Sequence, residues 1–348
     1  MSETESLVSL PPTKPLELEK GLTLVPRVKL NFTIYPNPTT AAMTMSKPIN
    51  EWKLKLALLD FFKSSLTVPI TVPEDDLQIQ RLGDLKKRKR DDPVAQGSLA
   101  IRDLGFLSKT RINSEEEEEE KDVKVLEEKY LDWRKYLLEK MDGLDLNLEG
   151  VKYKLNVAVP ASDDFEAMKK AWEDFYAFRN RGYSRGGKQE PDTIIMRGVP
   201  SRWFAEPLVS SKPSMLVTHS IFSRLGNIRD LNVSEDNDLG KEAEETMSVV
   251  SGLNCKIVVQ FEKHSDFYNA LKVLCGRSLQ KQGARLKADY EVTWDKDIFF
   301  RNSRSNTQDR TSRMPEMAVG NYRSEAPRRQ QQNTRFSPDD ARRKRFKD

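Results

Sequence analysis

Hydrophobic and polar residues alternate strictly over Arg27–Tyr35, which predicts a strand with one buried side. A helix should follow over Glu51–Phe62, because Asn50 can cap it and Trp52, Leu56, Leu59 and Phe62 recur at helical spacing. The same spacing predicts a second amphipathic helix over Val123–Met141. The alternating segment Leu144–Val159 then predicts closing strands. In the strand Arg27–Tyr35, one side carries Val28, Leu30, Phe32 and Ile34, and the other carries Lys29, Asn31, Thr33 and Tyr35.

These elements predict a first module over residues 22–160. Two middle strands are placed at Thr67–Val72 and Leu99–Phe106, which completes the order strand, helix, two strands, helix, strand. That order is ferredoxin-like, although the weak middle strands make the module degenerate. Residues 74–122 are expected to be a disordered charged insertion, because they contain a KKRKR run and six successive glutamates.

A second module is predicted more clearly over residues 191–298. Its strands are expected at Asp192–Pro200, after the turn at Gly226, at Lys256–Phe261 and from Arg285 onward. One helix ends in the segment Phe222–Ile228, and another spans Ser265–Gly276. This βαββαβ order predicts a four-stranded antiparallel sheet backed by two helices.

The order and spacing of the second module resemble an RNA-recognition motif. That family stacks bases on aromatic rings of its first and third strands. Alternation along the predicted strands leaves no ring on the corresponding open face here, which carries Ile195, Arg197, Lys256, Val258, Gln260, Lys287, Asp289 and Glu291. The face is therefore expected to bind single-stranded RNA weakly, or to bind a protein or nothing. Arg197 and Lys256 are its candidate RNA contacts, and Trp203 with Phe204 is either an exposed contact or tucked against the domain.

The remaining segments connect or flank the two modules. Residues 161–190 should form a connector helix, capped by Ser162 or Asp163, and a linker. Its aromatic stripe either docks a partner or packs against a neighbouring module. Residues 1–21 and 299–348 are expected to be disordered. The fold class is thus α+β, with two ferredoxin-like modules, a disordered charged insertion and a disordered basic tail.

The tail is the strongest candidate for RNA contact. Residues 301–348 contain 13 basic and 6 acidic side chains, a local charge of +7 in a chain whose net charge is +4. Such a segment can hold the RNA backbone through counterion release. Its alternative role is only to carry an import signal. The candidate RNA-binding residues in the tail are Arg301, Arg304, Arg310, Arg313, Arg328 and Arg329.

Two basic clusters are predicted to direct nuclear import. The alternative for the first cluster is a charged loop that keeps the insertion in solution. The clusters comprise Lys86, Lys87, Arg88, Lys89 and Arg90 in the insertion, and Arg342, Arg343, Lys344 and Arg345 in the tail.

Composition and motifs argue against several functional classes. The two cysteines and two histidines form neither a disulfide framework nor a metal-ligand cluster. The sequence contains no nucleophile with a base partner and no glycine-rich phosphate loop, so we expect neither an enzyme, a cofactor, a metal site nor a small-molecule substrate. With 32% charged residues, a mean hydropathy of −0.68 and no apolar run of membrane-spanning length, we expect an intracellular protein without membrane contact.

The segment PDTIIMRGVPSRWFAEP, followed by FSRLGNIRDLNV, resembles the A-kinase anchor protein 17A family of arginine/serine-rich splicing factor-like proteins, including its plant-type relatives. The resemblance covers roughly Leu22–Trp294. It implies a nuclear RNA-binding protein, associated with splicing-factor compartments and proteins and with regulation of pre-mRNA splicing. Kinase anchoring in that family uses a long helical C-terminal extension, which this sequence does not show. The alternative is a protein-interaction scaffold built from modules that resemble RNA-recognition motifs.

Overall fold

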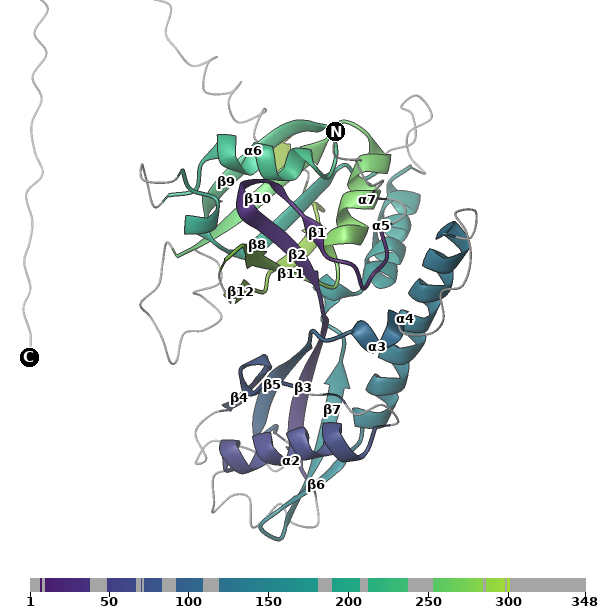
Figure 1. Ribbon diagram of the computed structural model, residues 1–348, viewed down its shortest axis with the longest axis vertical. Helices are drawn as coiled ribbons and strands as arrows, with labels where there is room; N and C mark the ends of the chain where they lie inside the picture. The colour runs from purple at the N-terminus through teal and green to yellow at the C-terminus, as the bar shows by residue number, and fades with distance from the viewer. Residues whose placement is uncertain are drawn as a thin grey trace, which may run out of the picture. The chain divides into compact units, whose positions relative to one another are not determined.

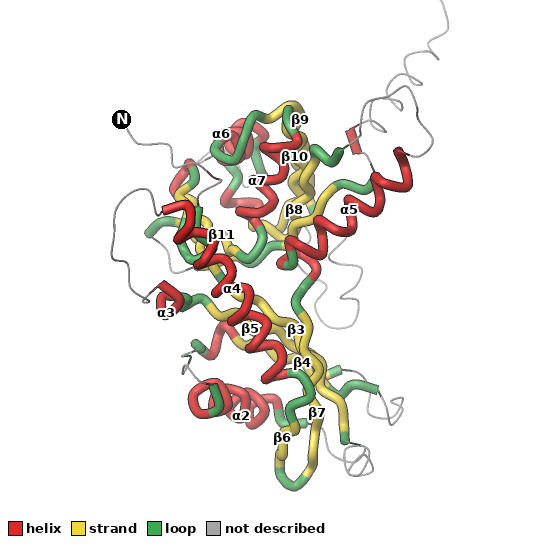
Figure 2. The backbone as a smooth tube through the Cα atoms, turned by 90° about the vertical axis from the view of Figure 1, so that its right-hand side faces the viewer, coloured by secondary structure: helices red, strands yellow, loops and turns green. Residues whose placement is uncertain are grey.

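The computed structural model describes residues 10–37, 49–66, 72–82, 92–108, 119–180, 190–206, 212–236, 253–283 and 286–297, together with Leu7, Ile70, Phe299 and Phe300. Helices combine with three sheets, and the pairings among the described strands are antiparallel (Figures 1 and 2). The fold class is therefore α+β.

The first sheet has the strand order β4-β5-β3-β7-β6. Its central strand, β3 (Val28–Pro36), pairs with β5 (Ala95–Ile101) and β7 (Val151–Ala158). The edges are β4 (Leu77–Arg81) and β6 (Asp145–Leu148). The β6–β7 hairpin turns through Glu149 and Gly150, both with positive φ, the backbone geometry that tight hairpins favour.

Two helices, α2 (Glu51–Ser64) and α4 (Glu119–Met141), lie on one side of this sheet (Figure 2). Both were predicted, and the Asn50 side chain caps α2 by accepting from the Lys53 amide at 3.2 Å. The alternation of β3 is also confirmed, since Val28, Leu30, Phe32 and Ile34 are buried against these helices. A short helix, α3 (Gly105–Ser108), precedes α4.

Gly97 on β5 permits a close approach inside this sheet. A Cβ atom at that position would lie 2.4 Å from the Phe32 ring and 2.3 Å from the Gln78 carbonyl oxygen. The Phe32 ring, only 2% exposed, therefore occupies the space that a side chain at Gly97 would need.

The first middle strand and the insertion of this module were wrongly placed from the sequence, and the second middle strand overlaps β5 only over residues 99–101. Ile70 and Val72 are buried outside any strand, whereas the strands are β4 and β5. Residues 74–122 also contain the 3₁₀ turn η3 (Glu74–Asp76), so this range is not one disordered insertion. Residues 74–122 were set apart because of their charged runs, yet Leu77 and Leu99 within them are almost completely buried in the core.

The second sheet has the order β13-β8-β10-β9. Its strands are β8 (Thr193–Pro200), β9 (Ile228–Glu235), β10 (Asn254–Phe261) and β13 (Glu291–Trp294). The helices α6 (Met215–Ser223) and α7 (His264–Leu274) connect them and pack on the core side. A 3₁₀ turn, η6 (Ser201–Trp203), follows β8. The predicted last strand from Arg285 is divided, because only Glu291–Trp294 joins this sheet.

A third sheet, β1-β2-β11-β12, was not foreseen. In it, β2 (Leu22–Pro26) pairs along β11 (Arg277–Lys281), which follows α7 some 250 residues later (Figure 1). The short strands β1 (Leu16–Glu17) and β12 (Lys287–Ala288) form its edges, and η2 (Glu19–Gly21) joins β1 to β2. Residues 10–21 are thus not a disordered terminus, because the buried Leu16, Leu22 and Leu24 anchor them to the second core.

The connector begins with the 3₁₀ turn η5 (Ala161–Asp163) and continues as α5 (Phe165–Asn180). Asp164, rather than Ser162 or Asp163, caps the helix by accepting from the Ala167 amide at 3.4 Å. The aromatic stripe of α5 packs against the second module: the Trp172 ring meets the Phe267 ring at 5.6 Å, and Phe175 meets Trp294 at 5.2 Å. The packing interpretation of the connector is therefore confirmed.

Candidate nucleic-acid interface

Arg197 and Lys256, the two predicted sheet contacts, lie together at a bulge in the second sheet. The pairing of β8 and β10 shifts between Cys255 and Ile257, so that Arg197 and Gly198 lie opposite Lys256. Gly198 adopts a φ of +77°, and its amide donates to Asp236 Oδ2 at 3.3 Å. Both basic side chains are half-buried.

Two residues at the centre of this face, which the sequence predicted to be open, are buried. Val258 is completely buried, and Gln260 is only 9% exposed. The Gln260 amide donates to Asp192 Oδ2 at 2.8 Å, so one of its two donors is already used within the protein. Glu291 lies directly opposite Arg197 on β13, which places a carboxylate beside the basic pair.

Two residues assigned to this face from the sequence lie elsewhere. Lys287 belongs to β12 in the third sheet. Asp289 lies between β12 and β13, where its Oδ1 accepts from Ser278 Oγ at 2.7 Å. The error followed from extending one strand through residues that divide between two sheets.

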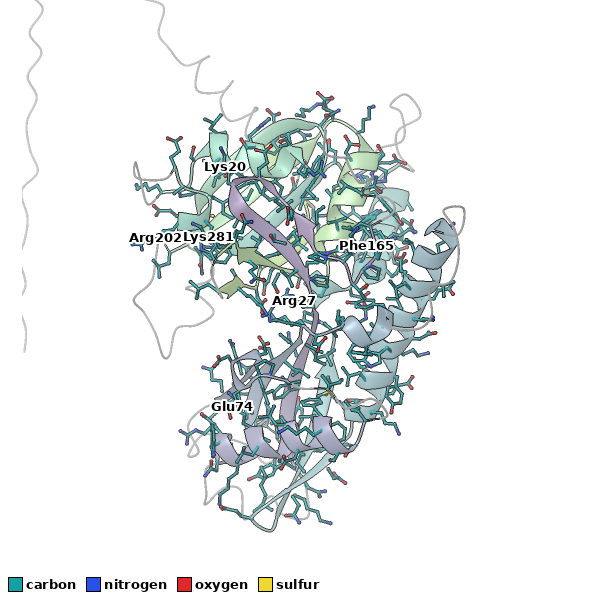
Figure 3. All side chains as sticks on the ribbon, viewed as in Figure 1. Lys20, Arg27, Glu74, Phe165, Arg202 and Lys281 are labelled. Atoms are coloured by element: carbon teal, nitrogen blue, oxygen red, sulfur yellow. The ribbon has the colours of Figure 1, made fainter. Side chains whose placement is uncertain are left out.

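Asp289 belongs to a polar network that links the modules around Arg27. Arg27 is completely buried where the chain passes from β2 to β3 (Figure 3). Its Nη1 lies 2.6 Å from Asp289 Oδ1, and its Nη2 lies 3.2 Å from Asp163 Oδ1. Arg102, which follows β5, contacts the same Asp289 oxygen at 3.1 Å and Asp76 Oδ1 at 2.8 Å.

Burial and ionic contacts act in opposite directions on the charges of this network, and burial raises the pKa of Asp163 more than Arg27 lowers it. Burial alone would raise the pKa of Asp289, but Arg27, the Ser278 hydroxyl and Arg102 outweigh it and lower the pKa to about 2. Burial would likewise lower the pKa of Arg27, and Asp163 and Asp289 raise it instead. We assign the network a structural role, because it joins segments of both modules.

The aromatic pair after β8, Trp203 and Phe204, packs inward, as one of the two interpretations predicted. Phe204 is completely buried and lies 6.4 Å from the Phe222 ring, centroid to centroid. Trp203 is partly buried and packs against the same core. These rings therefore do not form an exposed surface for bases.

The remaining candidates lie outside the described residues. The RNA-binding candidates among them are Arg301, Arg304, Arg310, Arg313, Arg328 and Arg329. The import candidates among them are Lys86, Lys87, Arg88, Lys89, Arg90, Arg342, Arg343, Lys344 and Arg345.

The first sheet carries an open surface that sequence reasoning missed. We call it the polar face: it is the side of the sheet opposite α2 and α4. Its signal was present in the polar side of the alternation Lys29, Asn31, Thr33 and Tyr35. With β4 and β5 misplaced, however, the neighbouring strands could not be aligned with it. The polar face comprises Lys29, Asn31, Thr33, Tyr35, Gln78, Gln80, Gln96, Ser98, Asp145, Asn147, Lys152, Lys154 and Asn156.

Three further properties concern the described part of the chain. No group of three or more His, Cys, Asp or Glu side chains there could hold a metal ion. Burial raises the pKa of the Cys255 thiol to about 12, which makes a reactive thiolate unfavourable at neutral pH. Among the described helices, none is both long and apolar enough to cross a membrane.

The sheets and helices described above define an α+β protein in which two sheet modules are joined by a buried ionic network. A sequence profile for the family described as AKAP-17A-like, RNA-binding domain, matches residues 107–336, and the chain belongs to this family. The human A-kinase anchor protein 17A is 29% identical over 154 residues. That match covers 42% of this chain and 22% of the human protein. The profile begins after β5, so β3, α2, β4 and β5 lie outside the matched region.

Proposed function

We propose that this is a nuclear RNA-binding protein associated with pre-mRNA splicing or its regulation, with splicing-factor proteins as further partners. The observation that carries the proposal is membership of an RNA-binding-domain family over residues 107–336. The matched region includes the whole second module and most of the basic tail.

The topology of both modules supports this proposal. In the second sheet, the order β13-β8-β10-β9 with two connecting helices is that of a ferredoxin-like βαββαβ module. The order β7-β3-β5-β4 in the first sheet is the same, with β6 added at one edge. Four-stranded sheets of this order are the scaffold of RNA-recognition motifs, so we interpret both modules as related to that motif.

We assign most of the affinity for RNA to the basic tail. The second sheet offers Arg197 and Lys256 beside Glu291, whereas the tail has a charge of +7. Deleting residues 301–348 should therefore weaken RNA binding by at least tenfold at low salt and flatten its salt dependence. Fluorescence anisotropy with a labelled RNA, measured from about 50 to 200 mM salt, tests this. Equal salt slopes for the full and shortened chains would remove the tail from the proposal.

Nuclear localisation is assigned to the two basic clusters. Replacing Lys86–Arg90 and Arg342–Arg345 together by alanine should move a fluorescently tagged protein to the cytoplasm. Each single-cluster variant serves as a control, because one cluster can suffice. Unchanged nuclear fluorescence in the combined variant would show that neither cluster is an import signal.

A protein-interaction scaffold is the second candidate function. It is favoured by the second sheet, where Val258 is completely buried and the amide of Gln260 is already bonded. Anchoring of a kinase is stated in the name of the human relative, of which this chain matches 22%. A full-length protein that fails to bind RNA even at low salt would favour the scaffold.

A further inference from the structure

We propose that a cleft between α4, the connector, the end of α7 and the N-terminal segment binds a small neutral ligand that carries an amide-like group, with a hydrogen-bond donor beside an acceptor. The residues of the cleft belong neither to the open faces of the two sheets nor to the basic tail. The inference therefore goes beyond the proposed function and does not depend on it. The sequence led us to expect no small-molecule substrate, and the inference concerns binding alone, without a chemical reaction.

The cleft forms where four segments of the chain meet (Figures 1 and 3). One wall is a single side of α4, which comprises Glu127, Tyr130, Leu131 and Arg134. The other walls come from the start of α5, from the end of α7 with the residues that follow it, and from the N-terminal segment around Leu10. The cavity measures about 80 Å³. A cavity of about 150 Å³ holds one benzene molecule, so this one can take a group of roughly three or four non-hydrogen atoms, with the rest of the ligand toward the solvent.

Arg277, the first residue of β11, supplies a buried cation to the cleft. It is only 4% exposed. Its Nη1 donates to the Val273 carbonyl at 2.7 Å, and its Nη2 donates to the carbonyls of Pro11 at 2.9 Å and Lys14 at 3.3 Å. Among the residues that the structure describes, Nε has no hydrogen-bond partner and no carboxylate forms an ion pair with the guanidinium. A buried cation that is held only by neutral carbonyls favours a further acceptor.

Asp163, at the end of η5, supplies an acceptor that lacks a donor. Its side chain is 5% exposed, and its Oδ1 lies 3.2 Å from Arg27 Nη2. Its Oδ2 has no hydrogen-bond partner in the described part of the chain. Burial raises the pKa of this carboxyl, although Arg27, Lys29 and the Gly276 backbone lower it. An N–H group of a ligand would therefore stabilise the charged carboxylate.

These two atoms define the polar part of the ligand. Buried polar groups nearly always have a hydrogen-bond partner, so one unpaired donor and one unpaired acceptor on residues of the same cleft call for a group that offers both. A carboxamide offers an acceptor oxygen and N–H donors on neighbouring atoms. A neutral ligand is favoured because the charged residues of the cleft balance. Three are acidic and three are basic, namely Glu127, Asp163 and Glu166 against Arg134, Lys272 and Arg277.

Apolar side chains determine the rest of the ligand. Four of them line the cleft: Leu10, Leu131, Phe165 and Val273. The Phe165 ring packs edge-on against Tyr268 at 5.1 Å, which holds its orientation. The ligand is thus a compact molecule with an apolar body and one amide group, the combination typical of small-molecule sites. Because α4 belongs to the first module and α7 to the second, a bound ligand would contact both modules and stabilise the folded chain.

Four probes of similar size test this chemistry on the full-length chain. Benzamide carries donors and an acceptor, benzoate carries only acceptors, benzamidine carries only donors with a positive charge, and toluene carries neither. Each probe is titrated into isotope-labelled protein, and the backbone amide chemical shifts are recorded by NMR. At equal concentration, we expect benzamide to produce shifts at least threefold larger than those of the other probes. The shifts should centre on residues 127–134, 163–166 and 272–277, and benzamide should raise the melting temperature most.

A filled cleft provides the matched variant. Leu131 is half-buried and lines the cleft, so Leu131→Trp should abolish the shifts caused by benzamide. Val125→Trp adds the same ring to α4 at a position that is 45% exposed and outside the cleft, and it should leave them unchanged. Thermal unfolding of each variant establishes that the fold is intact. If Leu131→Trp does not fold, the location of the shifts in the unaltered chain decides.

Several outcomes would overturn the inference. Equal shifts for benzamide and toluene would mean that the polar groups of the cleft do not select the ligand. Larger shifts for benzoate or benzamidine would contradict a neutral ligand. Shifts outside the three ranges, or shifts that persist in folded Leu131→Trp, would place the binding elsewhere. RNA binding, measured in parallel, bears only on the proposed function, so its absence would leave the inference about the cleft standing.

Discussion

At the scale of one residue, the side chain of Arg27 links the connector to the end of the second module. Its guanidinium is completely buried and contacts the carboxylates of Asp163 and Asp289, which come from the connector and from the end of the second module. Taking a charge out of water is costly unless partners compensate it. The loss of one partner should therefore destabilise the protein far more than the loss of a surface ion pair would.

The first prediction concerns Asp289, whose folded-state pKa is about 2 against an ordinary value near 4. A carboxyl whose pKa is lowered on folding adds stability above its unfolded pKa, and this stability is lost as pH falls toward the folded value. Asp289→Asn should therefore lower the free energy of unfolding at pH 7 by about 2 kcal/mol or more. The difference from the unaltered protein should shrink between pH 4 and pH 2.

Urea unfolding at several pH values measures this effect. Asp60→Asn makes the same change at an exposed position of α2 and serves as the control, for which we expect a difference within about 0.5 kcal/mol. A variant as stable as the unaltered protein at pH 7 would show that the network around Arg27 contributes no net stability.

At the scale of elements, local periodicity predicted the strands and helices whose hydrophobic pattern is complete within one segment of the chain. The strand β3 and the helices α4, α5 and α7 were found because their apolar residues recur at one spacing over two or more turns or pleats. The helix α2 was found, and of the four residues that predicted its buried side, Leu59 and Phe62 are buried and Trp52 and Leu56 are exposed. Trp52 is 55% exposed, whereas Leu54 and Leu58 are buried, because the helix is apolar on more than one side.

What the sequence could not reveal are the pairings between distant segments. The strand β11 has only one large apolar residue, Leu279, and its partner β2 lies some 250 positions earlier. No local pattern encodes such a register, since side-chain alternation specifies only which face a residue joins. The polar face was missed for the same reason, because its residues come together only when β4, β5 and β7 are aligned with β3.

The second prediction tests the ordered N-terminal segment. Leu24 on β2 is completely buried in the core of the second module, so Leu24→Ala should destabilise the protein by about 3 kcal/mol. Thr23→Ala changes the neighbouring position on the same strand, where the side chain is half-buried, and should cost much less. Thermal unfolding compares the two. Equal melting temperatures for both variants would indicate that β2 does not pack as described.

The pairing of β2 with β11 also changes which fragment containing the second module is expected to fold alone. A fragment of residues 190–298 would lack β2, which pairs with β11, and α5, which packs Trp172 against Phe267. Its core would expose apolar surface that the full chain buries. The compact unit to isolate therefore has to include the N-terminal strand and the connector helix as well.

At the scale of the whole molecule, the two modules should unfold together because charged contacts join them. Arg102 of the first module contacts Ser278 Oγ at 2.6 Å and Asp289 Oδ1 at 3.1 Å, and Lys272 of α7 contacts Glu127 of α4 at 2.8 Å. The strands β2 and β3, separated only by Arg27, also belong to different sheets. This coupling would hold the two modules in one orientation.

The last prediction is that Arg102→Met uncouples the modules. The side chain is only 11% exposed, and its loss leaves Asp76 and Asp289 without one of their cationic partners. Calorimetry should show one unfolding transition for the unaltered chain and two, or one broadened transition, for the variant. Arg81→Met is the matched control, because Arg81 is 55% exposed and pairs with Glu51 inside the first module. A single sharp transition in both variants would show that Arg102 is not needed to couple the modules.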